Sequence, residues 1–136
     1  MAEADLARTP DMKRILVVDD SSLVRLYYRS ALEKAGFKVE QAINGIEAME
    51  KVLSQAFDLV IVDVNMPRMD GFAFLRLLRS DGNADVAALP ALMISTESER
   101  QDMLAATAAG TNYYLVKPVS EADLVRYAAV LAGAKR

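Results

Sequence analysis

The chain has 136 residues, of which 53% are hydrophobic and 26% charged, a composition typical of one globular domain that folds without disulfides. Its formal net charge is −3, so neither nucleic acid nor an anionic membrane is expected as a direct partner. The sequence contains no His and no Cys, which excludes His-based triads, Cys nucleophiles and ordinary zinc sites. Any site chemistry must therefore come from carboxylates, hydroxyls, Lys, Tyr or an oxygen-bound metal.

The beginning of the chain, "MAEADLARTP", is acidic and lacks the apolar segment of a signal peptide. No stretch reaches the roughly 18 apolar residues that a membrane-spanning helix needs. We therefore expect a flexible tail over 1–12, a single domain over 13–136 and a cytoplasmic location, which the absence of Cys also fits.

Short apolar segments alternate with amphipathic ones along the rest of the chain. The predicted strands are 14–19, 37–42, 58–63, 90–95 and 111–116. The predicted helices are 21–36, 44–56, 70–80, 98–110 and 120–133. The segment 80–88, "SDGNADVAA", is the one loose connection inside the domain.

Capping residues support these helix boundaries. The predicted N-terminal signals are Asn44 with Glu47, Asp70, Ser98 with Gln101, and Ser120 with Asp123. The predicted C-terminal signals are Gly36, Gly110 and Gly133.

Five strand–helix units of this kind predict an α/β fold with a doubly wound, five-stranded parallel sheet between two layers of helices. Ligands of such sheets bind at the carboxyl ends of the strands. The residues expected at that edge are Asp19, Asp20, Asp63, Ser95, Thr96 and Lys117. Two carboxylates about 4 Å apart repel by roughly 4 kcal/mol at an effective dielectric of 20, so either a proton or a cation must offset the charge. Oxygen ligands with room for water suit Mg²⁺, and we expect Asp19 and Asp20 to hold it.

Each of these residues also has a simpler interpretation when it is taken alone. Asp20 would be a helix cap, and Lys117 a solvated surface charge. Ser95 would bond to the local backbone, and Tyr114 would be a core aromatic. Only their joint placement at one edge of the sheet favours a functional site.

The stretches "ILVVDD", "DLVIVDVNMPRMDG", "LMIST" and "YYLVKP" together resemble the response-regulator receiver domains of the CheY type. The resemblance covers nearly everything from Lys13 to Leu131. It implies the flavodoxin-like strand order 2-1-3-4-5 and two-component signalling, in which Asp63 accepts a phosphoryl group from a histidine kinase.

The resemblance also implies the roles of the other residues. Asp20, Asp63 and the backbone carbonyl of Asn65 would bind Mg²⁺, with Asp19 acting through a water. Ser95 and Lys117 would contact the phosphoryl group. Tyr114 would be the rotating aromatic of a switch, and the bond before Pro118 would be cis.

Other positions bear on the lifetime of the phosphoryl group and on the switch. Asn65 and Glu97 match the chemotaxis type at positions that tune the lifetime. Thr96 stands where Ala or Gly is common in the family, and its bulk would narrow access to the phosphoryl group. Tyr113 is large where a small residue is frequent, which would alter the swing of Tyr114.

Three alternative classes of protein fit the sequence less well. A haloacid-dehalogenase-type phosphatase would carry a D-x-D motif after the first strand, and "DDSS" lacks it. A flavodoxin-like or dinucleotide binder would need glycines in the first loop, where there are none. A degenerate receiver would have lost an acid or the Lys, and none is lost.

The partners follow from the resemblance. A histidine kinase or phosphotransfer protein would supply the imidazole that this chain lacks, so we expect a phosphoacceptor switch rather than an enzyme. The sequence ends soon after the last predicted helix, which favours output by protein contact unless the chain is part of a longer one. We expect that contact on 98–109, 111–116 and 120–132, with Tyr114 between the two helices.

Overall fold

Aliphatic runs form the three interior strands of the computed structural model, which describes residues 12–134. The strands are β1 (Arg14–Val18), β2 (Lys38–Ala42), β3 (Leu59–Val62), β4 (Ala91–Ser95) and β5 (Tyr113–Val116). The helices are α1 (Ser22–Lys34), α2 (Gly45–Ser54), α3 (Gly71–Arg79), α4 (Ala84–Ala87), α5 (Arg100–Ala109) and α6 (Glu121–Ala134). The predicted tail, apart from Met12, lies outside the described residues.

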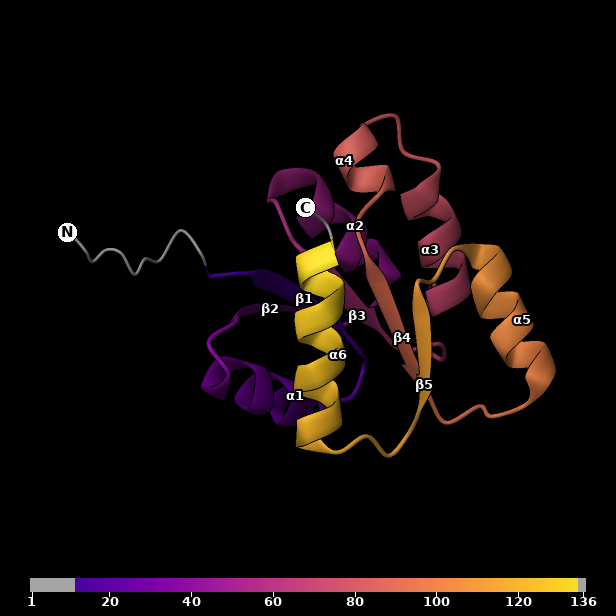
Figure 1. The fold of residues 1–136 in the computed structure, drawn as a ribbon. Coiled ribbons are helices and arrows are strands. Elements are labelled where there is room, and N and C mark those ends of the chain that lie inside the picture. The colour runs from indigo at the N-terminus through magenta and orange to yellow at the C-terminus, as the bar shows by residue number, and fades with distance from the viewer. Residues whose placement is uncertain (1–11, 135–136) are drawn as a thin grey trace.

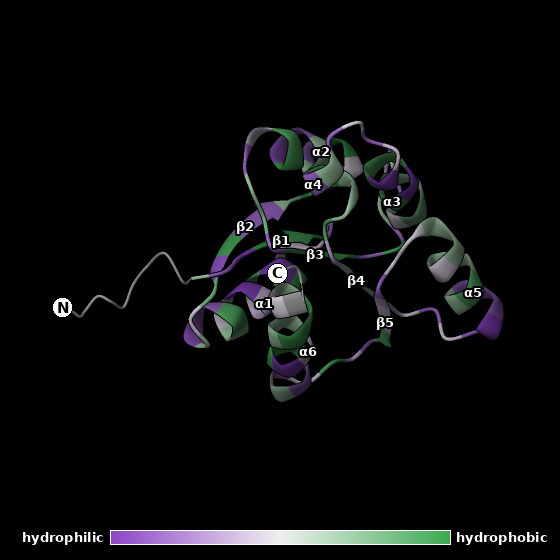
Figure 2. Cartoon of the chain, turned by 45° about the horizontal axis from the view of Figure 1, so that its top comes forward, coloured by the Kyte–Doolittle hydropathy of each residue, from purple (hydrophilic) through white to green (hydrophobic). Residues whose placement is uncertain are grey.

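All five strands pair in parallel in the order β2-β1-β3-β4-β5, which confirms the predicted topology. Helices α1 and α6 cover one face, and α2, α3 and α5 cover the other (Figure 1). Successive side chains of a strand point to opposite faces, so Leu16 and Val18 enter one core while Ile15 and Val17 enter the other. Figure 2 shows the central strands in the hydrophobic colour, as expected for strands covered on both faces.

The predicted capping residues at Asn44 and Asp70 are confirmed. The Asn44 side chain accepts a hydrogen bond from the N–H of Glu47, and Asp70 accepts one from Ala73. Gly110 ends α5 with a φ of 106°, a conformation that glycine adopts without strain.

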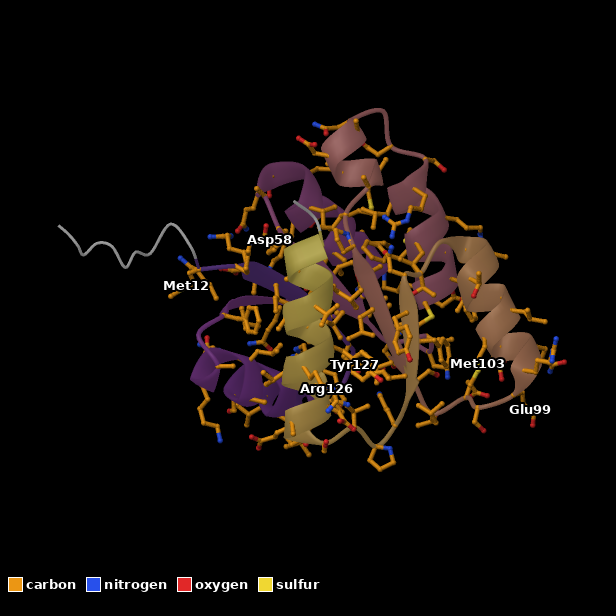
Figure 3. The ribbon with its side chains drawn as sticks, viewed as in Figure 1. Met12, Asp58, Glu99, Met103, Arg126 and Tyr127 are labelled. Atoms are coloured by element: carbon orange, nitrogen blue, oxygen red, sulfur yellow. The ribbon has the colours of Figure 1, made fainter. Side chains whose placement is uncertain are left out.

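Three details of the helices differ from the prediction. The capping box of α5 is formed by Glu99 and Asp102, one residue later than Ser98 and Gln101, and in it the Asp102 carboxylate accepts from the N–H of Glu99. Figure 3 shows Glu99 at the beginning of α5. Gly133 lies inside α6 instead of ending it. The loose connection contains the short helix α4, capped by Asn83.

Among the described residues, no helix combines the length and the apolar character that crossing a membrane requires.

Candidate phosphorylation and metal site

The register of the sheet brings the ends of β1 and β3 level, since Val18 pairs with Val62. Asp19 and Asp63 follow these residues directly, and the N–H of Asp63 bonds to the carbonyl of Val18. Oxygen atoms of Asp19, Asp20 and Asp63 lie within 4.8 Å of one another. The predicted acid cluster is therefore present, and its donor set of carboxylate oxygens is the kind that Mg²⁺ prefers.

The three acids differ in environment. Asp19 is 2% exposed, and its two oxygens contact the N–H of Ser21 at 2.9 Å and the ammonium of Lys117 at 3.3 Å. Asp20 is exposed, and its carboxylate has no hydrogen-bond partner among the described residues. The cap of α1 is the Ser21 hydroxyl, so Asp20 is not a helix cap.

Lys117 is the cation of the site, not a solvated surface charge. Its Nζ lies 3.3 Å from Asp19 Oδ2 and 3.4 Å from Asp63 Oδ1. The peptide bond between Lys117 and Pro118 is cis, as the resemblance implies. The N–H of Lys117 bonds to the carbonyl of Ser95 at 2.8 Å, which fixes the end of β5 against the end of β4.

Asp63 is 8% exposed, and its electrostatic environment is uncommon for a carboxylate. The pKa of Asp63 is raised to about 6, chiefly by burial and also by the nearby negative charge of Asp19. The Lys117 ammonium and the N–H of Val64 oppose the rise. The ammonium of Lys117 thus offsets only part of the negative charge of the three carboxylates. A second cation would therefore stabilise the cluster.

The loop after β3 passes close to the carbonyl of Asp63. A Cβ on Gly71 would lie 2.3 Å from that carbonyl oxygen, closer than any side chain tolerates. The N–H of Gly71 also bonds to the carbonyl of Val64 at 2.9 Å. Gly71 therefore lets α3 begin directly beside Asp63, a requirement that we did not predict from the sequence.

Ser95 and Tyr114 are connected through Glu97. The Ser95 hydroxyl, which is fully buried, accepts a hydrogen bond from the N–H of Glu97 at 3.1 Å. The Tyr114 hydroxyl donates to the carbonyl of Glu97 at 2.7 Å. Asn65 Nδ2 lies 3.4 Å from Glu97 Oε2, while Thr96 is exposed at the turn. The segment after β4 thus contacts both the acid-bearing loop and the aromatic on β5.

We expected Tyr114 to lie between α5 and α6, and the structure places it on the α5 side only. It packs against the core that includes Ala106 and Ala109 of α5. Tyr113 points to the other face and stacks on Tyr127 of α6 with ring centroids 4.9 Å apart. Figure 3 shows Tyr127 on α6 with Arg126 beside it. Alternation along the strand separates the two tyrosines.

Two features near the site escaped the sequence analysis. Arg25 of α1 donates to the carbonyl of Asp19 at 2.7 Å. A cavity of about 310 Å³ lies beside Lys117 and is lined by Leu23, Val24, Tyr27, Tyr28, Pro118 and Val119. A signal for Arg25 existed in its position six residues after Asp19, but the sequence alone did not show where its side chain points.

Known proteins resemble this chain in sequence and in fold. The family model of the response regulator receiver domain matches residues 15–129. Chemotaxis protein CheY-3 of Vibrio cholerae is 38% identical over 112 residues, which cover 82% of this chain and 85% of that protein.

Solved structures agree with the family match. Chemotaxis protein CheY4 of Vibrio cholerae superposes with a TM-score of 0.83 at 35% identity, covering 88% of this chain and 98% of that one. The receiver domain of the sensor histidine kinase PA1611 from Pseudomonas aeruginosa, with a magnesium ion coordinated in its active site cleft, has a TM-score of 0.82 at 25% identity, covering 90% and 98%. The chain therefore belongs to the response regulator receiver domain family and is a response regulator of two-component signal transduction.

Proposed function

We propose that Asp63 is the phosphoacceptor of this response regulator. The observation that carries this proposal is the position of Lys117, whose ammonium lies within 3.4 Å of both Asp63 and Asp19. Asp63 follows β3, the middle strand of the sheet, whereas both oxygens of Asp19 already have partners. The contact between Asp63 and the ammonium marks where a transferred phosphoryl group would meet a positive charge. Lys117 would then pair with the phosphoryl oxygens.

The transfer needs positioning and charge compensation more than covalent assistance. A carboxylate oxygen of Asp63 attacks the phosphorus of a phosphohistidine, the new O–P bond forms, and the P–N bond breaks. The electron pair of that bond stays on the donor imidazole. Because this chain has no His, the imidazole belongs to a partner. The attack requires a deprotonated Asp63, whose pKa is raised to about 6 in the metal-free protein. A cation bound at the cluster would lower this pKa and favour the reactive carboxylate.

Mg²⁺ fits the acid cluster. We assign Asp20, Asp63 and the backbone carbonyl of Asn65 as ligands, and Asp19 as a residue that acts through a water. The contacts of Asp19 support this difference, because both of its oxygens already have partners whereas the Asp20 carboxylate is exposed. When bound, Mg²⁺ would offset the negative charge that gathers as the phosphoryl group approaches. The PA1611 receiver domain holds a magnesium ion in its active site cleft, which supports Mg²⁺ as the cation.

Ser95 and Tyr114 form the proposed switch. A phosphoryl group on Asp63 adds nearly two negative charges and new acceptor oxygens. The Ser95 hydroxyl would turn from the N–H of Glu97 to those oxygens, and this change would alter the segment whose carbonyl holds Tyr114. Asn65, Thr96 and Glu97 line the same edge, and we propose that they tune the phosphoryl lifetime.

The proposed phosphodonor is a histidine kinase or a phosphotransfer protein. It must bring its imidazole to the strand ends, where Leu23 is 77% exposed, Leu26 57% and Tyr27 40% along α1. The proposed output surface is the face of α5, β5 and α6. Met103, Leu104 and Tyr113 are large apolar residues exposed there. Figure 3 shows Met103 on α5.

The family is one of signalling switches, and the chemotaxis relatives make a chemotaxis partner the first to test. The only activities that we propose for the chain itself are self-phosphorylation from small donors and autodephosphorylation. A haloacid-dehalogenase-type phosphatase is not favoured. A cytoplasmic location stays a prediction, which cell fractionation can test.

Intact-mass measurement after incubation with acetyl phosphate and Mg²⁺ tests the acceptor. The wild type should gain one phosphoryl group, Asp63→Ala should gain none, and Asp85→Ala, which alters an exposed acid on α4, should match the wild type. Full labelling of Asp63→Ala would refute the assignment.

A further inference from the structure

Arg25 joins three elements at the acid-bearing end of the sheet. It lies in the first turn of α1 and is half-buried. Its Nη1 donates to the carbonyl of Asp19 at 2.7 Å, and its Nε donates to Gln41 Oε1 at 3.0 Å. Gln41 belongs to β2, the edge strand that supplies no acid to the site. One guanidinium therefore ties α1 to the ends of both β1 and β2.

The dipole of α1 by itself disfavours a cation at this place, because the N-terminal turn of a helix carries partial positive charge. The first turn of α1 contains no acidic residue that would offset Arg25. Arg29, one turn later, has an ordinary exposed ion pair with Glu33 at 3.1 Å. Within α1 nothing offsets the charge of Arg25, so its position depends on its two hydrogen bonds and on the acids at the strand ends.

The carbonyl that Arg25 holds belongs to the peptide unit between Asp19 and Asp20. A peptide unit is planar, so fixing its carbonyl also fixes the directions in which the chain enters and leaves it. The N–H of Asp19 bonds to the carbonyl of Ala42 at 3.1 Å, which holds the other side of the same residue. Asp20 has no side-chain partner among the described residues, so its carboxylate is placed through the backbone that Arg25 fixes.

We propose that Arg25 is a positioning residue for divalent-cation binding at the cluster of Asp19, Asp20 and Asp63. It orients the Asp19–Asp20 peptide so that both carboxylates face the cation, and Gln41 holds the guanidinium in place. A lysine cannot replace it, because the planar fork of Arg donates in two fixed directions at once. This inference rests on the proposed function, since it concerns the same metal site.

The sign of the effect separates positioning from simple electrostatics. If Arg25 acted only as a charge, its removal would deepen the negative potential at the cluster and tighten Mg²⁺ binding. If it positions the acids, its removal weakens Mg²⁺ binding, and partners that orient metal ligands have effects of about tenfold or more. Because Arg25 acts through one peptide unit, we expect about a five- to tenfold rise in the Mg²⁺ Kd of Arg25→Met.

The experiment is a titration of the metal-free protein with Mg²⁺ at constant ionic strength. Binding is monitored by the chemical shifts of the backbone amides. Arg25→Lys keeps the charge and Gln41→Met removes only the second acceptor, and each should raise the Kd about threefold. Arg29→Met removes an equal charge from the same helix and should stay within about twofold of the wild type. Without any metal, the amides of Asp19 and Ser21, which bond to the Ala42 carbonyl and the Asp19 carboxylate, should exchange faster in Arg25→Met than in Arg29→Met.

A Kd for Arg25→Met that is unchanged or lower would overturn the inference. If Arg25→Met fails to fold, wild-type affinity in both Arg25→Lys and Gln41→Met would overturn it equally. Failure of the wild type to bind Mg²⁺ would instead refute the metal assignment of the proposed function, and this inference with it.

Discussion

The hydroxyl of Tyr114 donates a 2.7 Å hydrogen bond to the backbone carbonyl of Glu97. Glu97 in turn donates its N–H to the buried hydroxyl of Ser95. An aromatic residue on the last strand is therefore two hydrogen bonds away from a hydroxyl at the proposed phosphorylation site. A change in the hydrogen bonding of Ser95 would therefore affect Tyr114, on the face of α5 and β5, through Glu97.

Removing this hydroxyl tests the connection. Tyr114→Phe should lower the free energy of unfolding by about 0.5–1.5 kcal/mol, the net value of one hydrogen bond. Tyr27→Phe is a matched variant, because the Tyr27 hydroxyl donates to the carbonyl of Val119 at 3.0 Å, away from Glu97. Urea unfolding should give similar losses for both. Only Tyr114→Phe should speed amide exchange over 96–99, and equal exchange in both variants would contradict the connection.

Beryllofluoride, which stands in for the phosphoryl group on Asp63, should remodel the proposed output face. We expect amide protection to change over 95–118 more than in α1, because the segment after β4 contacts both Ser95 and Tyr114. Hydrogen exchange with and without beryllofluoride measures this. Changes restricted to the loop around Asp63 would mean that the partner binds elsewhere.

The crowded carboxylates should make stability depend on Mg²⁺. A ligand that binds only the folded state stabilises it by mass action, by about 1.4 kcal/mol at ten times its Kd. Millimolar Mg²⁺ should therefore raise the melting temperature of the wild type. In Asp20→Asn the increment should shrink, while the metal-free protein should become more stable because one repulsive charge is gone. Asp85→Asn is the control, and equal increments in Asp20→Asn and the control would argue against a ligand at Asp20.

The raised pKa of Asp63 predicts a pH dependence of stability in the absence of metal. The folded-state pKa of about 6 lies above the ordinary value of 3.8, so the folded protein binds this proton more tightly than the unfolded chain. The resulting stabilisation is complete below pH 3.8 and is lost as the pH rises through 6. It amounts to at most about 3 kcal/mol.

Asp63→Asn removes this titration. The free energy of unfolding of Asp63→Asn, relative to that of the wild type, should therefore rise by about 1 kcal/mol between pH 5 and pH 7. Urea unfolding with a chelator present measures this difference. A constant difference across that range would show that the pKa of Asp63 is not raised.

Gly71→Ala should damage both the fold and the site. The added methyl group would lie 2.3 Å from the carbonyl oxygen of Asp63, and a backbone atom there cannot move aside easily. Overpacking of this kind costs about 1–3 kcal/mol. Gly82→Ala is the control, because nothing lies within 4 Å of the added Cβ. Thermal unfolding of the two variants compares them directly, and equal stability would mean that the loop after β3 relaxes freely.

The alternation of apolar runs with amphipathic helices was enough to predict the layers of the fold, because burial of the strands on both faces leaves few other arrangements. The strand order was implied by the resemblance. Local signals such as the caps at Asn44 and Asp70 were also predictable, since each depends on a side chain and an N–H three residues away. The cap of α5 was placed one residue early, because Ser98 and Glu99 are both plausible caps and only the backbone path decides between them.

The sequence by itself also determined which residues could form the site, since acids, a hydroxyl and a Lys that end parallel strands must meet at one edge. Only the tertiary structure decided how they share their contacts. Lys117 reaches Asp19 and Asp63, which lie 98 and 54 positions away along the chain, and Arg25 reaches across to β2. Tyr114 turned toward α5 and Tyr113 toward α6 because the pleat of β5 assigns them to opposite faces. Such contacts depend on the packing of elements distant in sequence, which no local pattern of residues encodes.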